Sequence, residues 1–141
     1  MTALTPYLIF GGRCEEALAF YRDAVGAEVE MVMRFDQSPE PMPPGSLPPG
    51  FEQKVMHASA SIGGARLMAS DGCYDRAGKY DGFQLALQVP TAAAARKAFD
   101  GLADGGTVQM PLTPTFWSPC FGMVADKFGV TWMVMVPGQA G

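Results

Sequence analysis

The feature that most constrains this chain of 141 residues is an order of elements that occurs twice. Each half reads as a strand, an amphipathic helix, a second strand and a β-hairpin, and the two first strands start 77 positions apart, at Tyr7 and Gln84. Because one such unit buries little apolar surface by itself, two of them are expected to fold together. We therefore predict a single α+β domain made of two βαβββ modules, at about 1–71 and 83–141, with a linker at 72–82.

The elements of the first half follow from apolar spacing. Apolar residues recur at helical intervals after Cys14 and stop at Gly26, which is typical of an amphipathic helix with a glycine end. Alternating or β-branched stretches around it predict strands, and Gly63 with Gly64 predicts a two-residue hairpin turn. The expected elements are a helix at 14–25 and strands at 5–10, 28–35, 55–62 and 65–70.

The second half repeats this order. A helix is predicted from about Thr91, with Gly105 and Gly106 ending it. The strand after it is expected to end at Met110, because Pro111 has no backbone donor for a sheet. A loop containing three prolines should then lead to the last hairpin. The expected strands are 83–89, 107–110, 121–125 and 131–136.

A proline-rich segment, 36–51, interrupts the first half. Its six prolines remove backbone donors and favour extended geometry over a helix or a central strand. Loops of this length are uncommon in small domains and usually have a functional role. The segment, which we call the proline-rich arm, is predicted to be a lid, a binding loop or an arm onto a partner.

Composition excludes several classes of function. The net charge of −4 and the scattered lysines and arginines leave no basic stripe for a nucleic acid. No apolar run approaches the length of a membrane span and no leader pattern is present, so a cytoplasmic protein is expected. Three distant cysteines without CxxC spacing predict reduced thiols.

Apolar residues make up 48% of the chain, and part of this apolar surface is expected to face a partner subunit.

Several segments give the chain a family resemblance. It resembles the vicinal oxygen chelate superfamily, also called the glyoxalase/bleomycin resistance/dioxygenase superfamily, and specifically its PhnB-like branch. The resemblance implies curved mixed sheets around a cleft, a homodimer, and a small-molecule ligand. The segments that carry it are PYLIF at 6–10, CEEA at 14–17, FY at 20–21, MHA at 56–58, MASD at 68–71, FW at 116–117 and DKFGVTW at 126–132.

The resemblance also implies where a metal would be held. In metal-using members, His or Glu on the first strand of each module and Glu on the last strand hold one divalent ion. The corresponding positions here are Tyr7, Gln84 and Val134, and a phenol, an amide and an aliphatic chain are poor ligands for such ions. Neighbours one residue away offer nothing better, so we predict no metal and no cofactor.

Two residues are candidates for chemistry. His57, the single histidine, could act as a general acid or base, although a lone strand histidine more commonly hydrogen-bonds locally. Cys120 would be a nucleophile only if His57 activated it, and an inert thiol is the simpler interpretation. Asp71 and Asp126 are assigned to capping and to a turn.

The expected ligand surface is aromatic and rich in methionine. Tyr7, Gln84, Phe116 and Trp117 are predicted to line the cleft, with the wider set Met31, Met33, Met68, Met110 and Met133 as adaptable lining or plain core. The leading hypothesis is a metal-free domain that binds a small, partly apolar molecule and has no assignable reaction. The alternatives are a metal-dependent glyoxalase or dioxygenase-type enzyme with other ligands, and a non-catalytic dimeric interaction module that docks through the proline-rich arm.

Overall fold

The computed structural model describes residues 2–40, 42–73 and 79–138. The chain divides into two compact units, Met1–Gly78 and Lys79–Gly141, and each is described by itself. That the two units form a single domain stays a prediction. Among the described residues, no helix is both long enough and apolar enough to cross a membrane.

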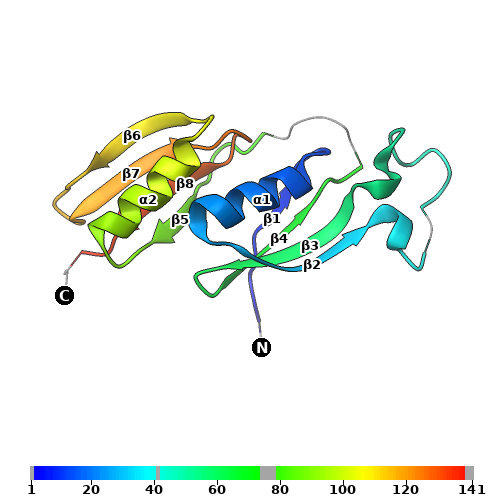
Figure 1. Cartoon of the computed structure of the whole chain (residues 1–141), viewed down its shortest axis with the longest axis horizontal. Helices are drawn as coiled ribbons and strands as arrows, with labels where there is room; N and C mark the ends of the chain where they lie inside the picture. Colours follow the sequence, from blue (N-terminus) through cyan, green and yellow to red (C-terminus); the bar gives the residue numbers. More distant parts are fainter. Residues whose placement is uncertain (1, 41, 74–78, 139–141) are drawn as a thin grey trace. The chain divides into compact units, whose positions relative to one another are not determined.

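Unit 1 contains a four-stranded mixed sheet and one long helix (Figure 1). The strand order is β1-β4-β3-β2, with β1 parallel to β4 and the other pairs antiparallel. Two short 3-10 helices, η1 (Phe35–Gln37) and η2 (Phe51–Gln53), lie at the two ends of the proline-rich arm. The main elements are β1 (Tyr7–Ile9), α1 (Cys14–Val25), β2 (Glu28–Arg34), β3 (Val55–Ile62) and β4 (Ala65–Ser70).

Unit 2 repeats the arrangement (Figure 1). Its strand order is β5-β8-β7-β6, again with one parallel pair, β5 with β8. Its elements are β5 (Leu85–Gln88), α2 (Ala92–Ala103), β6 (Thr107–Thr113), β7 (Cys120–Ala125) and β8 (Thr131–Val136). The predicted α+β class with two βαβββ modules is therefore confirmed.

In unit 1 the helix packs on small side chains. Ala58, Ala60 and Ala69 lie on neighbouring positions of β3 and β4 and are almost fully buried. Such small residues let the apolar stripe of α1, which includes Leu18 and Tyr21, approach the sheet closely. The helix therefore covers one face of the sheet, and the opposite face is not covered by a helix in the described part of this unit.

Unit 2 reaches the same packing with a glycine. Gly122, in the central strand β7, lies beneath Phe99 of α2, and a Cβ atom placed there would come within 2.8 Å of the phenyl ring. Val124, Trp132 and Val134 complete the buried face under this helix. Each sheet therefore packs one of its faces against a helix.

The first turn of α1 is capped from a distant part of the chain. Arg13, at the N-cap position, makes no side-chain cap. Instead, Asp71 at the end of β4 accepts hydrogen bonds from the backbone N–H groups of Gly12 and Cys14, at 2.8 and 2.7 Å, and from that of Val55 at 2.9 Å. This buried carboxylate, 1% exposed, ties the start of α1 to the start of β3. The capping role expected of Asp71 is confirmed.

Turn and helix ends follow the sequence pattern. Gly63 and Gly64 both have positive φ, 57° and 86°, as a two-residue hairpin turn requires. Gly26 ends α1 in the left-handed conformation, with its N–H bonded to the carbonyl of Arg22. Thr91 caps α2 by accepting from the N–H of Ala94.

The prediction that a strand ends before Pro111 is wrong. Strand β6 continues through Pro111 to Thr113. It is the edge strand of its sheet and its register with β7 is irregular between Met110 and Thr113, so a proline without a donor is tolerated.

The first strands are shorter than the sequence pattern indicates. Strand β1 covers only residues that pair with β4, although hydrogen bonds from Met68 to Pro6 and from Phe10 to Ser70 flank it. Strand β5 starts at Leu85, so Gln84 lies just before it.

Candidate functional site

The face of each sheet opposite its helix is called here its open face. On unit 1, strand register places the open-face residues in rows, since cross-strand partners point to the same side. The helix-facing residues between them, such as Leu8 and Ala58, are buried. The open face of unit 1 carries Tyr7, Met31, Met33, His57, Ser59 and Met68.

Two of the predicted site residues meet on this face. The hydroxyl group of Tyr7 and Nδ1 of His57 lie 3.2 Å apart, and the two rings are 5.7 Å apart between centroids. Tyr7 is 44% exposed, so this pair is open to solvent. A neutral imidazole that accepts a hydrogen bond from the tyrosine hydroxyl at Nδ1 carries its own proton on Nε2. The pair forms a polar group among methionine side chains.

On unit 2 the open face carries thioethers and aromatic rings. Met110, Met123 and Met133 are consecutive cross-strand partners on β6, β7 and β8, and Met135 lies opposite Phe121. The amide of Gln84 donates a hydrogen bond to Sδ of Met123 at 3.3 Å, so Gln84 also faces this side. The predicted methionine set therefore reaches the open faces, and Met123 and Met135 extend it.

The predicted wall residues Phe116 and Trp117 lie in the loop before β7. The Trp117 ring packs edge-on against Phe116, at 4.7 Å between centroids, and against Phe121 at 5.4 Å. Phe116 is 97% exposed and Trp117 is 43% exposed. Because Phe121 lies on the open face, these rings extend the apolar surface of unit 2 beyond its strands.

The position assigned to a third metal ligand is one residue out of phase. Val134 is fully buried on the face that α2 covers, opposite Leu87 and Gly122. A shift of one residue changes the face in a strand, so Met133 and Met135 are the residues of β8 that share the open face with Gln84. The side chains of β8 that face the open side are therefore the thioethers of Met133 and Met135, and not the aliphatic side chain of Val134.

The cysteines differ in their surroundings. Burial raises the pKa of the Cys14 thiol, and the nearby Asp71 adds to this effect, so Cys14 stays protonated. Cys120 pairs with Val136 on β8 and points to the side opposite Phe121, away from the open face. It lies in unit 2 and His57 lies in unit 1, and the interpretation of Cys120 as an inert thiol stays a prediction.

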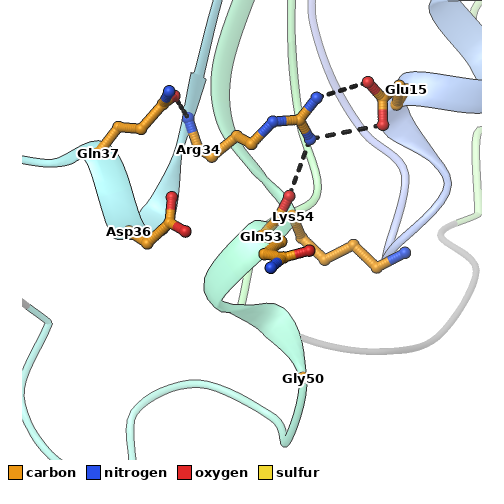
Figure 2. Close-up of a pocket in the computed structure, with 7 residues that line it drawn as sticks. All are labelled: Glu15, Arg34, Asp36, Gln37, Gly50, Gln53 and Lys54. Carbon is orange, nitrogen blue, oxygen red and sulfur yellow. Dashed lines mark hydrogen bonds and ion pairs between the residues drawn. The ribbon is translucent and has the colours of Figure 1, made fainter.

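A polar depression lies at the root of the proline-rich arm (Figure 2). It has a volume of about 860 Å³, and sequence reasoning did not identify it. Figure 2 shows the guanidinium of Arg34 between the carboxylate of Glu15 and the carbonyl of Gln53. It donates to the carboxylate at 2.6 Å and to the carbonyl at 2.8 Å. The side chain of Lys54 donates to the carbonyl of Gly12 at 3.0 Å.

These contacts join the two ends of the arm to α1. The Arg34 backbone N–H is held by the side chain of Gln37, and the Phe35 N–H bonds to the carbonyl of Lys54. The hydrogen bond from Arg34 lowers the pKa of Glu15, with partial burial opposing the change. Acids and bases balance along this wall, so we interpret the depression as a structural clasp.

Asp126 has a structural role in unit 2. Its carboxylate accepts the backbone N–H groups of Phe128 and Val130 and the indole N–H of Trp132, at 2.9, 3.1 and 2.9 Å. The expected turn assignment is confirmed, and the bond to Trp132 extends it. Asp71 is likewise bound to three backbone N–H groups, so both buried carboxylates serve structural roles.

The family is shown by comparison with known proteins. A model of the Glyoxalase/Bleomycin resistance protein/Dioxygenase superfamily matches residues 3–134. The chain belongs to this superfamily. Protein YjdN of Escherichia coli (strain K12) is 36% identical over 141 residues, covering 96% of each chain.

Solved structures support a PhnB-like superfamily member. Protein PA1353 from Pseudomonas aeruginosa is 41% identical, with a TM-score of 0.82 over 97% of this chain and 98% of that one. The PhnB protein from Bacillus cereus, described as a putative 3-demethylubiquinone-9 3-methyltransferase, is 28% identical with a TM-score of 0.78, over 96% and 99% of the two chains. The resemblance found in the sequence is thus confirmed.

The residues present do not fit the divalent ion of metal-using superfamily members. Within the described ranges, no three His, Cys, Asp or Glu residues gather as a ligand set. The superfamily's ligand positions hold a phenol at Tyr7, an amide at Gln84 and thioethers at Met133 and Met135, which are weak donors for Zn²⁺ or Mn²⁺. His57 adds a single imidazole on the open face of unit 1, which by itself does not make a ligand set.

Proposed function

We propose that this protein binds a small, partly apolar molecule on the open faces of its sheets, with no metal in the superfamily's ligand positions. The observation that carries the proposal is the composition of these faces. Thioethers and exposed aromatic rings lie where the helices do not cover the sheets. Such side chains are flexible or broad enough to bind ligands of varied shape.

The polar groups would set the orientation of the ligand. Tyr7 and His57 offer a hydroxyl and an imidazole on unit 1, and Gln84 offers an amide on unit 2. Binding sites for small molecules commonly combine an apolar lining with a few placed polar groups. A carbonyl or hydroxyl compound with an apolar body suits the polar groups of either open face. The cleft predicted between the two sheets stays a prediction.

The methyltransferase description of the Bacillus cereus relative is not extended to this chain. A nucleotide-like methyl donor would need a glycine-rich loop with available N–H groups. Here the N–H of Gly12, in the Gly11 and Gly12 turn, is bound by Asp71. The turn serves the cap of α1.

Trp117 provides the direct test. We expect anilinonaphthalene sulfonate, an apolar dye with one anionic group, to bind the native protein saturably with increased emission. Truncation of this half-exposed ring in Trp117→Ala should weaken binding at least about tenfold, since aromatic anchors dominate such sites.

Val108→Ala is the matched control. Val108 is also a half-exposed apolar residue of unit 2, but it pairs with Val124 on the helix-facing side. Its affinity for the dye should remain at the native value. Equal affinities of the native and Trp117→Ala proteins, or no saturable binding, would overturn the proposal.

A second candidate is proton-transfer catalysis by His57. The hydrogen bond to Tyr7 favours it, because a base held by a partner keeps one orientation. The test is deuterium incorporation from solvent into a panel of small carbonyl compounds, followed by proton NMR. Incorporation by the native protein that disappears in His57→Gln would establish this activity.

The metal-dependent alternative has its own readouts. Activity that a divalent ion stimulates and a chelator abolishes would favour an enzyme of the glyoxalase or dioxygenase type. Near-stoichiometric Zn²⁺, Mn²⁺, Ni²⁺ or Fe²⁺ after purification, lost in Gln84→Ala, would refute the metal-free part of the proposal.

In this proposal the protein acts in the cytoplasm as a homodimer. The exposed apolar residues of the edge strands, Val29 and Val32 on β2 and Val108 on β6, would be partly covered in a dimer. A monomer by light scattering at micromolar concentration would remove the dimer from the account.

A further inference from the structure

Four methionines occupy three adjacent strands of unit 2 on one side. Met110, Met123 and Met133 follow one another across β6, β7 and β8, because the first two are register partners and so are the last two. Met135 lies two residues beyond Met133 on the same strand and the same face. No other group of thioethers in the described residues is joined by successive register pairs.

Their spacing allows at least three sulfur atoms to meet. Cross-strand partners have Cβ atoms roughly 4.5–5.5 Å apart, and residues two apart on a strand are separated by about 6.8 Å. A methionine side chain has three rotatable bonds and carries its sulfur well beyond Cβ. Met123 and Met133 are cross-strand partners, Met133 and Met135 are two apart on β8, and Met123 and Met135 are diagonal neighbours roughly 7–8 Å apart. Long methionine side chains on these three positions can bring their sulfurs to a common point above the sheet.

The sulfurs are placed for access from the open face. Met123, Met133 and Met135 are each part-exposed, and Met110 is 36% exposed. The sulfur of Met123 already accepts a hydrogen bond from the amide of Gln84 at 3.3 Å. This is a weak bond to a soft acceptor, which a stronger electrophile would replace.

The chemistry of thioethers selects one class of electrophile. A thioether is a neutral, polarizable donor that prefers soft cations, above all Cu(I), whereas carboxylates and imidazoles serve harder or borderline ions. The superfamily's ligand positions on this face hold no carboxylate or imidazole, as shown above for Gln84 and Met133. Because thioethers stand where metal-using members of the superfamily have carboxylates or imidazoles, this face should bind soft cations and not the harder divalent ions.

We propose that the open face of unit 2 binds one soft monovalent cation, Cu(I) or Ag(I), through the thioethers of Met123, Met133 and Met135, with Met110 as an outer donor. The inference goes beyond the proposed function, which needs these side chains only as apolar surface.

Unit 1 provides the internal comparison. Its open-face methionines Met31 and Met33 lie on β2, while Met68 lies on β4 with Ser59 of β3 between the strands. The strand between them keeps Met68 about two strand spacings, roughly 9.6 Å, from β2. This face lacks the adjacent set of three thioethers, so it should bind the same ions more weakly.

The experiment uses Ag(I) in a protein from which the accessible thiols are removed. Cys73 and Cys120 are replaced by serine because thiolates bind Ag(I) strongly, and Cys14 is kept because it is fully buried. Calorimetry in chloride-free buffer measures affinity and stoichiometry, and NMR of methyl-labelled methionine identifies the sulfurs involved. We expect one Ag(I) per chain and shifts of the Met123, Met133 and Met135 methyl signals.

The decisive variant is Met123→Leu with Met133→Leu. Leucine keeps the apolar volume and removes the thioether, so Ag(I) binding should weaken at least about tenfold relative to the parent. Met31→Leu with Met33→Leu is the matched control and should leave Ag(I) affinity within about twofold of the parent.

Two results would overturn the inference. One is equal Ag(I) affinity in the parent and in the Met123→Leu, Met133→Leu protein. The other is an Ag(I) titration that leaves the three methyl signals unmoved in the parent, a readout that needs no methionine substitution. The dye tests the proposed function separately. A parent protein that binds Ag(I) but not the dye would refute the proposed function and leave the Ag(I) site in place.

Discussion

Unit 1 carries a hydrogen-bonded tyrosine and histidine on its open face, whereas unit 2 carries a row of thioethers and an aromatic corner. Their helix-covered faces are alike, because each is apolar and has small residues beneath the helix. These are Ala58 and Ala69 in unit 1 and Gly122 in unit 2. Packing constrains the covered faces, because a helix must approach them closely. The open faces are free of this constraint and have diverged, which makes them the place to look for function.

The units also differ in how their helices begin. Thr91 caps α2 from the adjacent position, while α1 depends on Asp71, which lies 57 residues beyond Cys14. A local cap stabilises a helix whatever the rest of the unit does. A distant cap exists only when β4 is already in place, so α1 and the sheet of unit 1 should form together.

The largest expected effect is that of Asp71→Ala. It leaves three backbone N–H groups without their carboxylate, two of them at the start of α1, and should lower the free energy of unfolding by at least about 3 kcal/mol. Urea denaturation measures it. Asp36→Ala, at an exposed aspartate of the same unit, should change stability by under about 0.5 kcal/mol. Equal effects of the two substitutions would remove the distinction between the capping modes.

The next effect concerns the covered face of unit 2. Gly122→Ala would place a methyl group within 2.8 Å of the Phe99 ring and 3.0 Å of the Met110 carbonyl, so the helix must shift. We expect a loss of about 1–3 kcal/mol in thermal or urea unfolding. Ala86→Ser, on the open face of the same sheet, is the control and should be nearly neutral. A neutral Gly122→Ala would show that the covered face is less constrained than claimed.

A smaller effect is expected at the open face of unit 1. Tyr7→Phe keeps the ring and removes the hydroxyl bound to His57, so stability should fall by no more than about 1 kcal/mol at this exposed position. Nitrogen NMR of the imidazole should nevertheless report a changed environment at Nδ1. An unchanged Nδ1 signal would mean that the pair is not formed in solution.

The smallest effect belongs to the clasp at the arm. Arg34 lowers the pKa of Glu15 in the folded protein. The contribution of this pair to stability is therefore full above the ordinary pKa of a glutamate and is lost as the pH falls through the lower pKa of the folded state. Glu15→Gln should therefore lower the melting temperature by about 1–3 °C at neutral pH. The difference should vanish in acid, and a difference that grows in acid would contradict the assignment.

The sequence was sufficient for the fold and for part of the site. Helical spacing after Cys14 and the glycine pair at Gly63 and Gly64 carry local signals, and both were correctly predicted. The extension of β6 through Pro111 was missed because only the sheet order shows that this strand lies at an edge.

Faces and distant partners were harder to predict. The direction of Val134 depends on strand phase, which a shift of one residue reverses. After Thr131 the sequence of β8 is apolar throughout and does not show which residues face the helix, so only the burial pattern of the structure identifies Met133 and Met135 as open-face residues. The cluster of Glu15, Arg34 and Gln53 joins residues separated by a long arm, and no pattern in the chain connects them.

Methionine methyl NMR during titration with anilinonaphthalene sulfonate tests the central claim most directly, because it observes both open faces in the intact protein. Met42 in the arm and Met56 on the helix-facing side of β3 serve as internal references. We expect saturable shifts of open-face methyl signals, led by Met123, Met133 and Met135, of which Met135 lies opposite Phe121, the ring that Trp117 packs against. The signals of Met42 and Met56 should not move. Shifts confined to Met42 and Met56, or no shift at saturating dye, would contradict the claim.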